Sequence, residues 1–365
     1  MKHRAFLLYE EDLFPKKKKT FLTTDLQMQT DGNRARENTT KPGTDSSALT
    51  PCKTAAVGYF RPMKQFPVVD CKKAAIAVFA LLMICGARHA FAGIVTVTPE
   101  AKSFKLGAFE LSVLRDSGLV YSNYGAIFGL NAGRAAVAEA LDGAGAPTNE
   151  IYFDVDALLI RVPEHLVLID AGYGPANRGV IQKSLALAGV SPRDITDILI
   201  SHSHLDHIGG LVDAKGQSAF PRAAIRMSAN EWAFMQATSN AAVPVIQAQV
   251  KTFEPGHEIL PGITPRALFG HTPGHTGYEI ASQEHRLVAT GDLTHSAIIS
   301  LKKPEWTLAW DSDRKKGAAT RREELQRIVD THELVFAPHF PFPGVGRIER
   351  SGDGFKFVPD LPSDK

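Results

Sequence analysis

The stretch "ILISHSHLDHIGG", residues 198–210, places three histidines and one aspartate within six positions, directly after an apolar run. Imidazoles and carboxylates are costly to bury unless they find partners. His202 and His204 point to the same side of an extended segment, because side chains alternate along it with a period of two. The chain must then turn before Asp206 and His207 can reach the same place. Either the stretch is a polar loop that happens to be rich in histidine, or the four side chains share one ligand.

The distribution of cysteine limits the kind of metal site that the chain can build. All three cysteines, Cys52, Cys71 and Cys85, precede residue 93. The rest of the sequence therefore offers neither a disulfide nor a thiolate ligand. A metal ion bound there must be held by histidine and carboxylate groups, which suit zinc and also accept iron or manganese.

Strand-like and helix-like segments alternate along residues 93–365, and this alternation predicts an α/β fold. Residues 121–150 are rich in glycine and alanine and are expected to be irregular. The predicted strands are 108–118, 151–172 with a turn at Pro163-Glu164, 195–200, 223–228, 277–282, 286–292 and 333–339. The predicted helices are 180–190, 228–237 and 319–332.

Polar residues lie just past the ends of several of these strands. His202 follows "DILI", Asp292 follows "RLVAT" and His339 follows "LVFAP". Strand ends are positions where a rigid scaffold holds side chains still and leaves room for a substrate. We therefore expect these three segments to meet in one functional site.

The segment "SHSHLDHIGG" matches the H-x-H-x-D-H signature of the metallo-β-lactamase superfamily, and four other segments resemble further elements of that family in the same order. The resemblance covers about residues 100–360 and implies a four-layer αββα sandwich, in which two β-sheets lie between helices. The four other segments are "LIDAG" (168–172), "HTPGHT" (271–276), "TGD" (290–292) and "APHFPFPG" (337–344).

The resemblance also implies a set of metal ligands and a mechanism. Two adjacent ions share a hydroxide that attacks the substrate, with Asp206 and Asp292 among the catalytic residues. Asp170 would orient ligands without binding metal. The implied ligands are His202, His204 and His275 for the first ion, Asp206, His207 and His339 for the second, and Asp292 as the bridge.

Two further histidines lie close to this ligand set in the sequence. We expect His271 to form hydrogen bonds in its loop instead of binding metal. His295 lies three residues after Asp292 and is a candidate proton donor or substrate contact. Packing without a catalytic role is an equal alternative for His295.

Within the superfamily, the chain most resembles methyl parathion hydrolase-like and acyl-homoserine-lactone lactonase-like members. The resemblance rests on "GDLTH" (291–295), "WDSDRKKGAATRRE" (310–323) and the segment 339–360. Several of the lactonases have a tyrosine where this chain has His295. The predicted function is hydrolysis of a phosphotriester, a carboxylic ester or a lactone. A di-iron redox enzyme and an RNA- or DNA-hydrolysing enzyme remain alternatives on the same fold.

The walls of a substrate pocket are less well defined by the sequence than its ligands. Aromatic residues near the motifs are candidates for an apolar pocket, and packing in the core is the alternative for each of them. These candidates are Trp306, Trp310, Phe340, Phe342 and the segment "YSNYGAIFG" (121–129).

The net charge of +2 is unevenly distributed along the chain. Residues 93–365 carry 26 basic and 31 acidic residues, a net charge of −5. A mildly acidic body argues against binding to nucleic acid or to an anionic membrane. We expect a small-molecule substrate, no nucleic-acid partner and no stable membrane anchor, and homodimer formation remains open.

The N-terminal region has the features of an export signal. Residues 63–92 contain the basic pair Lys72-Lys73, an apolar run too short to span a bilayer, and the small-x-small sequence that ends at Ala92. We predict cleavage after Ala92 and a periplasmic or secreted protein. Residues 1–62 are polar and are predicted to be disordered, or to result from translation that starts upstream of Met63.

Overall fold

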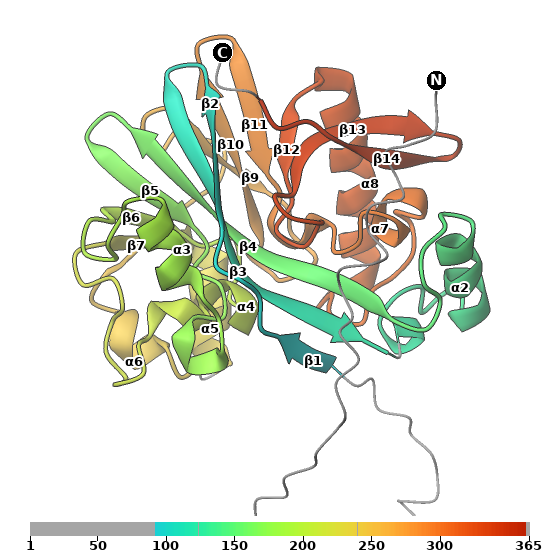
Figure 1. The fold of residues 1–365 in the computed structure, drawn as a ribbon, viewed down its shortest axis with the longest axis horizontal. Coiled ribbons are helices and arrows are strands. Elements are labelled where there is room, and N and C mark those ends of the chain that lie inside the picture. Colours follow the sequence, from blue (N-terminus) through green and yellow to red (C-terminus); the bar gives the residue numbers. More distant parts are fainter. Residues whose placement is uncertain (1–91, 123, 239, 363–365) are drawn as a thin grey trace, which may run out of the picture. The chain divides into compact units, whose positions relative to one another are not determined.

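The computed structural model describes residues 92–122, 124–238 and 240–362 (Figure 1). The predicted extension 1–62 and the predicted signal peptide 63–92 lie outside the described residues, except for Ala92, where the first strand begins. Within the described ranges, no helix has the length and apolar character needed to cross a membrane.

The described strands form two sheets. The eight-stranded sheet has the order β1-β3-β4-β5-β6-β7-β8, with β2 paired to β3. The six-stranded sheet has the order β14-β13-β12-β11-β10-β9. The strands of the first sheet are β1 (Ala92–Val95), β2 (Ala101–Leu106), β3 (Phe109–Tyr121), β4 (Ile151–Val162), β5 (His165–Ile169), β6 (Asp197–Leu199), β7 (Ala224–Ser228) and β8 (Val250–Phe253). Those of the second sheet are β9 (Ile263–Ala267), β10 (Thr276–Ser282), β11 (His285–Ala289), β12 (Leu334–Phe336), β13 (Val345–Ser351) and β14 (Gly354–Pro359).

Helices connect these strands and cover the sheets. The α-helices are α2 (Arg134–Asp142), α3 (Ile181–Leu187), α4 (Leu205–Ile208), α5 (Ala229–Ala237), α6 (Val243–Ile246), α7 (Ile299–Lys302) and α8 (Arg314–Thr331). Short 3-10 turns are η1 (Tyr124–Ala126), η2 (Pro175–Asn177), η3 (Gly209–Leu211) and η4 (Gly291–Leu293).

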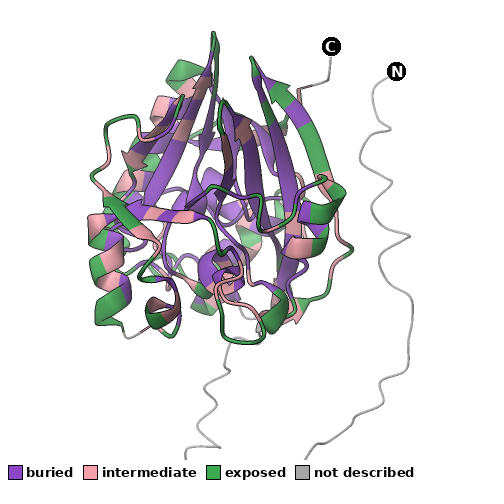
Figure 2. Ribbon diagram, turned by 90° about the vertical axis from the view of Figure 1, so that its left-hand side faces the viewer, coloured by how far each residue is buried: buried purple, intermediate pink, exposed green. Residues whose placement is uncertain are grey.

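Side chains on the two faces of each sheet enter different cores. In β5, Val167 and Ile169 belong to the core between the sheets, whereas Leu168 belongs to the core under α3 and α5. This division follows from the alternation of side chains along a strand. On the second sheet, Val288 of β11 packs with Leu325 of α8 in an outer core. Figure 2 shows the buried strands at the centre and exposed residues on the outer helices. These layers confirm the predicted α/β fold and its αββα arrangement.

The structure corrects two expectations about local structure. Residues 121–150 are not entirely irregular, because they contain helix α2, whose sequence RAAVAEALD is rich in strong helix formers. The segment 340–360, for which the sequence analysis predicted no element, contains the hairpin β13–β14, in which Ile348 is buried between exposed Arg347 and Glu349. The long helix α8 begins at Arg314, five residues before the start predicted at residue 319. The side chain of Asp313 caps it by accepting a hydrogen bond from the backbone N–H of Lys316.

The expected meeting of strand ends is confirmed. Strands β5 and β6 are parallel, as are β11 and β12. Parallel strands place their carboxyl ends at the same edge of a sheet. Asp170 directly follows β5, His202 follows β6, Asp292 follows β11 and His339 follows β12.

Candidate metal centre

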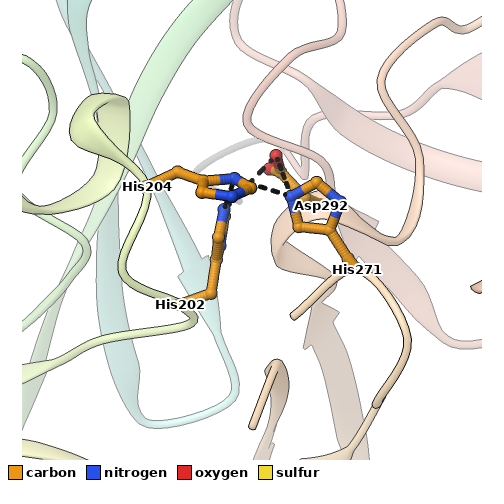
Figure 3. Close-up of side chains that lie close together, drawn as sticks. All are labelled: His202, His204, His271 and Asp292. Carbon is orange, nitrogen blue, oxygen red and sulfur yellow. Dashed lines mark hydrogen bonds and ion pairs between the residues drawn. The ribbon is translucent and has the colours of Figure 1, made fainter. Parts of the chain in front are cut away.

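Four side chains from three segments that connect strands converge at one point (Figure 3). They are His202 and His204 from the segment after β6, His271 from the β9–β10 loop, and Asp292 from η4. The His204 Nδ1 atom lies 3.0 Å from His202 Nε2 and 2.9 Å from His271 Nε2. The Asp292 Oδ2 atom lies 3.2 Å from His271 Nε2 and 3.5 Å from His202 Nε2. We call the three histidines the first ligand group, and Asp292 lies beside it.

Asp206, His207 and His339 form the second ligand group. The turn predicted after His204 is the start of α4, which carries Asp206 and His207. The Nε2 atoms of His207 and His339 each lie 3.0 Å from Asp292 Oδ1, and 3.8 and 3.6 Å from Asp206 Oδ2. The two oxygens of Asp292 therefore face different groups, which is the geometry of a carboxylate that bridges two ions.

The chemistry of these groups fits metal binding. Zinc–nitrogen bonds of about 2.0–2.1 Å place nitrogens around a tetrahedral ion about 3.3 Å apart, close to the separations in the first group. His207 Nε2 and Asp292 Oδ1 are buried and lie 3.0 Å apart, yet neither takes part in a hydrogen bond among the described residues. Buried polar atoms rarely lack partners, and a cation bound between the His207 and Asp292 side chains would satisfy both atoms.

The structure corrects the expected role of His275. Its Nδ1 donates to the Leu268 carbonyl at 2.9 Å, and its Nε2 accepts the backbone N–H of Asp292 at 3.0 Å. Because both ring nitrogens are engaged, His275 has no lone pair left for a metal ion. It instead holds the segment that carries Asp292.

His271 takes the place that was expected for His275. His271 was expected to serve as a hydrogen-bonding residue of the loop, but its Nε2 points into the first ligand group. Both side chains are buried, but His275 immediately precedes β10 and is held by Leu268 and Asp292, whereas His271 lies four residues earlier in the loop. In the sequence the two histidines differ in their distance from the start of β10, and contacts with the Asp292 segment decide which of them faces the ligands.

Four of the five candidate ligand histidines are oriented by a hydrogen bond at the ring nitrogen that faces away from the site. His202 Nδ1 lies 3.1 Å from the Ser201 hydroxyl. His207 Nδ1 lies 2.8 Å from Asp170 Oδ2, and His339 Nδ1 lies 2.8 Å from the Asp154 carbonyl. His271 Nδ1 lies 3.0 Å from Asp311 Oδ1. Such bonds fix the tautomer and the ring orientation of a metal ligand. Asp170 acts as the resemblance implied, whereas the sequence did not identify Asp311.

Asp311 is itself held by Arg321, a side chain of α8 that is only 2% exposed. The Arg321 Nη2 atom donates to Asp311 Oδ2 at 3.1 Å, and Nε donates to the Leu293 carbonyl at 2.9 Å. Leu293 directly follows Asp292. A buried ion pair is stable only when its remaining donors also find acceptors. The Arg321 Nη1 atom donates to two further backbone carbonyls. Arg321 thus supports His271 and the Asp292 segment together.

The pKa values indicate a site that favours a positive charge. Burial opposes the charge of Asp292, but His207 and His339 hold its pKa well below the usual range. Burial also opposes a charge on His271, but hydrogen bonds to Asp292 and Asp311 raise its pKa to about 9. Burial and the neighbouring His271 lower the pKa of His204 to about 4. The carboxylates thus favour a positive charge in the site, and His271 must release its proton before its Nε2 can bind a cation, because metal ligands have to be deprotonated.

A cavity of about 230 Å³ opens beside both ligand groups. The candidates Tyr121 and Trp310 line it, whereas Trp306, Phe340 and Phe342 do not, and Phe340 is fully buried in a core. The apolar wall is formed by Leu119, Tyr121, Phe153, Tyr173, Leu205 and Trp310.

His295 also lines the cavity and is 3% exposed. Its Nε2 lies 3.0 Å from Asp292 Oδ2, and its ring stacks on that of His339 at a centroid distance of 5.5 Å. Burial lowers the pKa of His295 to about 4, against the opposing effect of Asp292. The structure therefore places His295 beside the candidate bridging carboxylate, where a neutral imidazole faces the cavity.

The chain matches the family described as "Metallo-beta-lactamase superfamily" over residues 152–339, which is more than half of its 365 residues. Among curated proteins, it is 28% identical to metallo-beta-lactamase domain-containing protein 1 of Xenopus laevis over 39% of this chain and 53% of that protein. It is 40% identical to a ribonuclease Z of Methanothermobacter thermautotrophicus over 15% of this chain and 16% of that protein. The chain thus spans about half the length of the first relative and far less of the second.

Two solved structures are similar over a larger part of the chain. One is AidC, described as a dizinc quorum-quenching lactonase in complex with a homoserine product, with 29% identity and a TM-score of 0.65 over 72% of this chain and 98% of AidC. The other is AbOPH, described as a hydrolase in the beta-lactamase superfamily, with 25% identity and a TM-score of 0.67 over 73% of this chain and all of AbOPH.

Proposed function

The chain belongs to the metallo-β-lactamase superfamily, and from that premise we propose that it is a hydrolase of uncharged ester-type substrates that uses two metal ions. The observation that carries this proposal is the position of Asp292, whose two carboxylate oxygens face separate ligand groups. When bound, two ions supply a hydroxide near neutral pH and polarise the oxygen of the substrate. Esters, lactones and phosphotriesters are all open to attack of this kind.

Zinc is the metal that the ligands favour. Imidazole nitrogens and carboxylate oxygens are ligands that zinc accepts readily, and iron and manganese also bind to them. AidC, which is similar in fold and 29% identical, is described as dizinc. We therefore propose two zinc ions, the first held by His202, His204 and His271 and the second by Asp206, His207 and His339, with Asp292 between them.

The cavity supports an uncharged substrate with an apolar substituent. No lysine or arginine is among the described residues that line it, and Tyr121, Phe153 and Trp310 supply aromatic surface. An anionic phosphodiester would find no cationic side chain there. The similarity to ribonuclease Z covers only 16% of that protein, so we favour an ester-type substrate over a nucleic acid.

His295 is proposed to assist the leaving group. Its Nε2 lies close to Asp292 Oδ2, but neither ring nitrogen makes a hydrogen bond among the described residues, and the ring borders the cavity. From this position an imidazole can orient the substrate or deliver a proton to a poor leaving group. Asp206 and Asp292 are proposed to serve as ligands that keep the reacting centre in place.

A metal analysis followed by a substrate panel tests this function. We expect two zinc ions per chain and cleavage of nitrophenyl esters, acyl-homoserine lactones or a phosphotriester such as paraoxon. Oligonucleotides and phosphate monoesters serve as charged controls and are expected to remain intact. Cleavage of the charged controls alone would contradict the proposal, and two bound irons with oxygen uptake would favour the redox alternative.

A further inference from the structure

Glu231 is a fully buried carboxylate in the first turn of α5, outside both ligand groups. Its Oε1 atom accepts hydrogen bonds from the Ser203 backbone N–H at 2.7 Å and from the Ser203 hydroxyl at 2.6 Å. Its Oε2 atom accepts from the Thr272 hydroxyl at 2.6 Å and from the Gly274 backbone N–H at 3.2 Å. One side chain thus bonds to two loops that are far apart in sequence.

Both loops carry ligands of the first group. Ser203 lies between His202 and His204, and Thr272 directly follows His271. The two oxygens of Glu231 are divided between the loops, so this carboxylate fixes the distance between their backbones. Hydrogen bonds to a charged acceptor are about twice as strong as neutral ones, and here all four lie in the interior.

The local sequence would lead us to expect a different use for this glutamate. Ser228 and Glu231 form the pattern S-x-x-E, in which the glutamate usually bonds back to the N-terminus of its own helix. Ser228 does cap α5, because its hydroxyl accepts the Glu231 N–H at 3.2 Å and donates to the Gly274 carbonyl at 2.7 Å. The Glu231 carboxylate instead extends to the two ligand loops.

Close packing keeps the β9–β10 loop against the start of α5. A Cβ atom added to Gly274 would lie 2.1 Å from the Glu231 backbone nitrogen, so only glycine fits at this contact. The loop therefore approaches α5 through its backbone, and Glu231 bonds to it without an intervening side chain. This contact leaves the loop little freedom to shift relative to His202 and His204.

The second ligand group has different supports. His207 is held by Asp170, and His339 is held by the Asp154 carbonyl. No hydrogen bond links Glu231 to these residues in the described part of the chain. Any change at Glu231 should therefore affect one ligand group more than the other.

We propose that Glu231 is a positioning residue that sets the affinity of the first metal position by holding the loops of His202, His204 and His271 together. The inference rests on the proposed two-metal function. It concerns metal binding only, so it can be tested without a substrate.

The test is Glu231→Gln in the full chain, with zinc withdrawn stepwise by a chelator of known affinity. Glutamine has one acceptor oxygen and one NH₂ group. The backbone N–H of either Ser203 or Gly274 must therefore face the glutamine NH₂ group, which is itself a donor. We expect the affinity for the first ion to fall on the order of 10- to 100-fold, as for other residues that orient metal ligands. The affinity for the second ion should change by less than about threefold, because its supports remain intact.

Asp197→Asn is the matched control. Asp197 is a buried carboxylate at the start of β6, the strand that leads to His202, and it bonds to His165, Arg226 and Thr196. This variant should lower Tm and leave both metal affinities unchanged. If Glu231→Gln weakens both ions equally, or neither, Glu231 has no selective positioning role and the proposal fails.

Should Glu231→Gln not fold, Thr272→Ala removes one of the four bonds and is expected to weaken the first ion severalfold. If each ion then binds to Thr272→Ala with the same affinity as to the wild type, the proposal is overturned. A wild-type protein that binds two ions but cleaves no ester would contradict only the proposed function. A wild-type protein that binds no metal would contradict both.

Discussion

Replacing His271 and His275 separately distinguishes a metal ligand from a residue that supports one. His271→Ala removes one ligand of the first group, whereas His275→Ala removes the acceptor of the Asp292 N–H and the donor to the Leu268 carbonyl. The two residues lie four positions apart in one loop, so general damage to the loop would affect both variants alike.

The size of each effect follows from the structure. Zinc sites with four protein ligands have apparent binding free energies of about 10–16 kcal/mol, so one ligand accounts for about 3 kcal/mol, or on the order of a hundredfold in affinity. His271→Ala should therefore lose one ion. His275→Ala leaves two buried groups unpaired, at about 1–3 kcal/mol each, and should lower the free energy of unfolding by about 2–6 kcal/mol.

The assay measures zinc content, chelator competition and Tm on the same preparations. His271→Ala should retain one ion per chain, with the affinity for the second ion least affected. His275→Ala should bind two ions when zinc is in excess and lose at least about 4 °C in Tm. Any loss of affinity in His275→Ala should fall on both ions, since Asp292 faces both groups. Selective loss of one ion in His275→Ala, with two retained in His271→Ala, would refute the ligand assignment.

Three further predictions concern other parts of the chain. Asp311→Asn should weaken the first ion on the order of 10- to 100-fold, because His271 loses its charged acceptor; elemental analysis and chelator competition measure this, and an unchanged affinity would contradict it. His295→Ala should lower kcat roughly 10- to 1000-fold with both ions retained, and less for nitrophenolate leaving groups; equal rates with good and poor leaving groups would exclude the proposed role. N-terminal sequencing of the exported protein should begin at Gly93, and retention of residues 1–62 would contradict the predicted signal peptide.

The fold was predictable because its signals are local and repeated. Alternating apolar runs indicate strands, and five separated motifs in the right order specify the superfamily. Helix α2 was missed because glycine-rich flanks obscure a nine-residue helix. The hairpin β13–β14 was missed because Arg347 and Glu349 on its exposed face make the segment resemble a polar loop.

The site was less predictable where it depends on contacts between distant segments. Motif spacing identified the histidines around Asp206, but it does not show which of the two histidines of "HTPGHT" faces the ligands. That choice depends on where β10 begins and on the backbone N–H of Asp292, which donates a hydrogen bond to His275 Nε2. Asp311 and Glu231 resemble ordinary surface acids in the sequence, because their partners lie 40 and 28 residues away.

The buried carboxylates around the site explain why its geometry needs so many segments of the chain. Burying a negative charge is costly unless donors or a cation compensate it. Asp170 and Glu231 are compensated by N–H and hydroxyl groups, and Asp311 is compensated by Arg321. Asp292 differs, because its Oδ1 has no hydrogen-bond partner among the described residues and its neighbours are imidazoles of both groups. Among these four carboxylates, the one that lies between the two ligand groups is thus the one that the protein leaves for a cation to compensate.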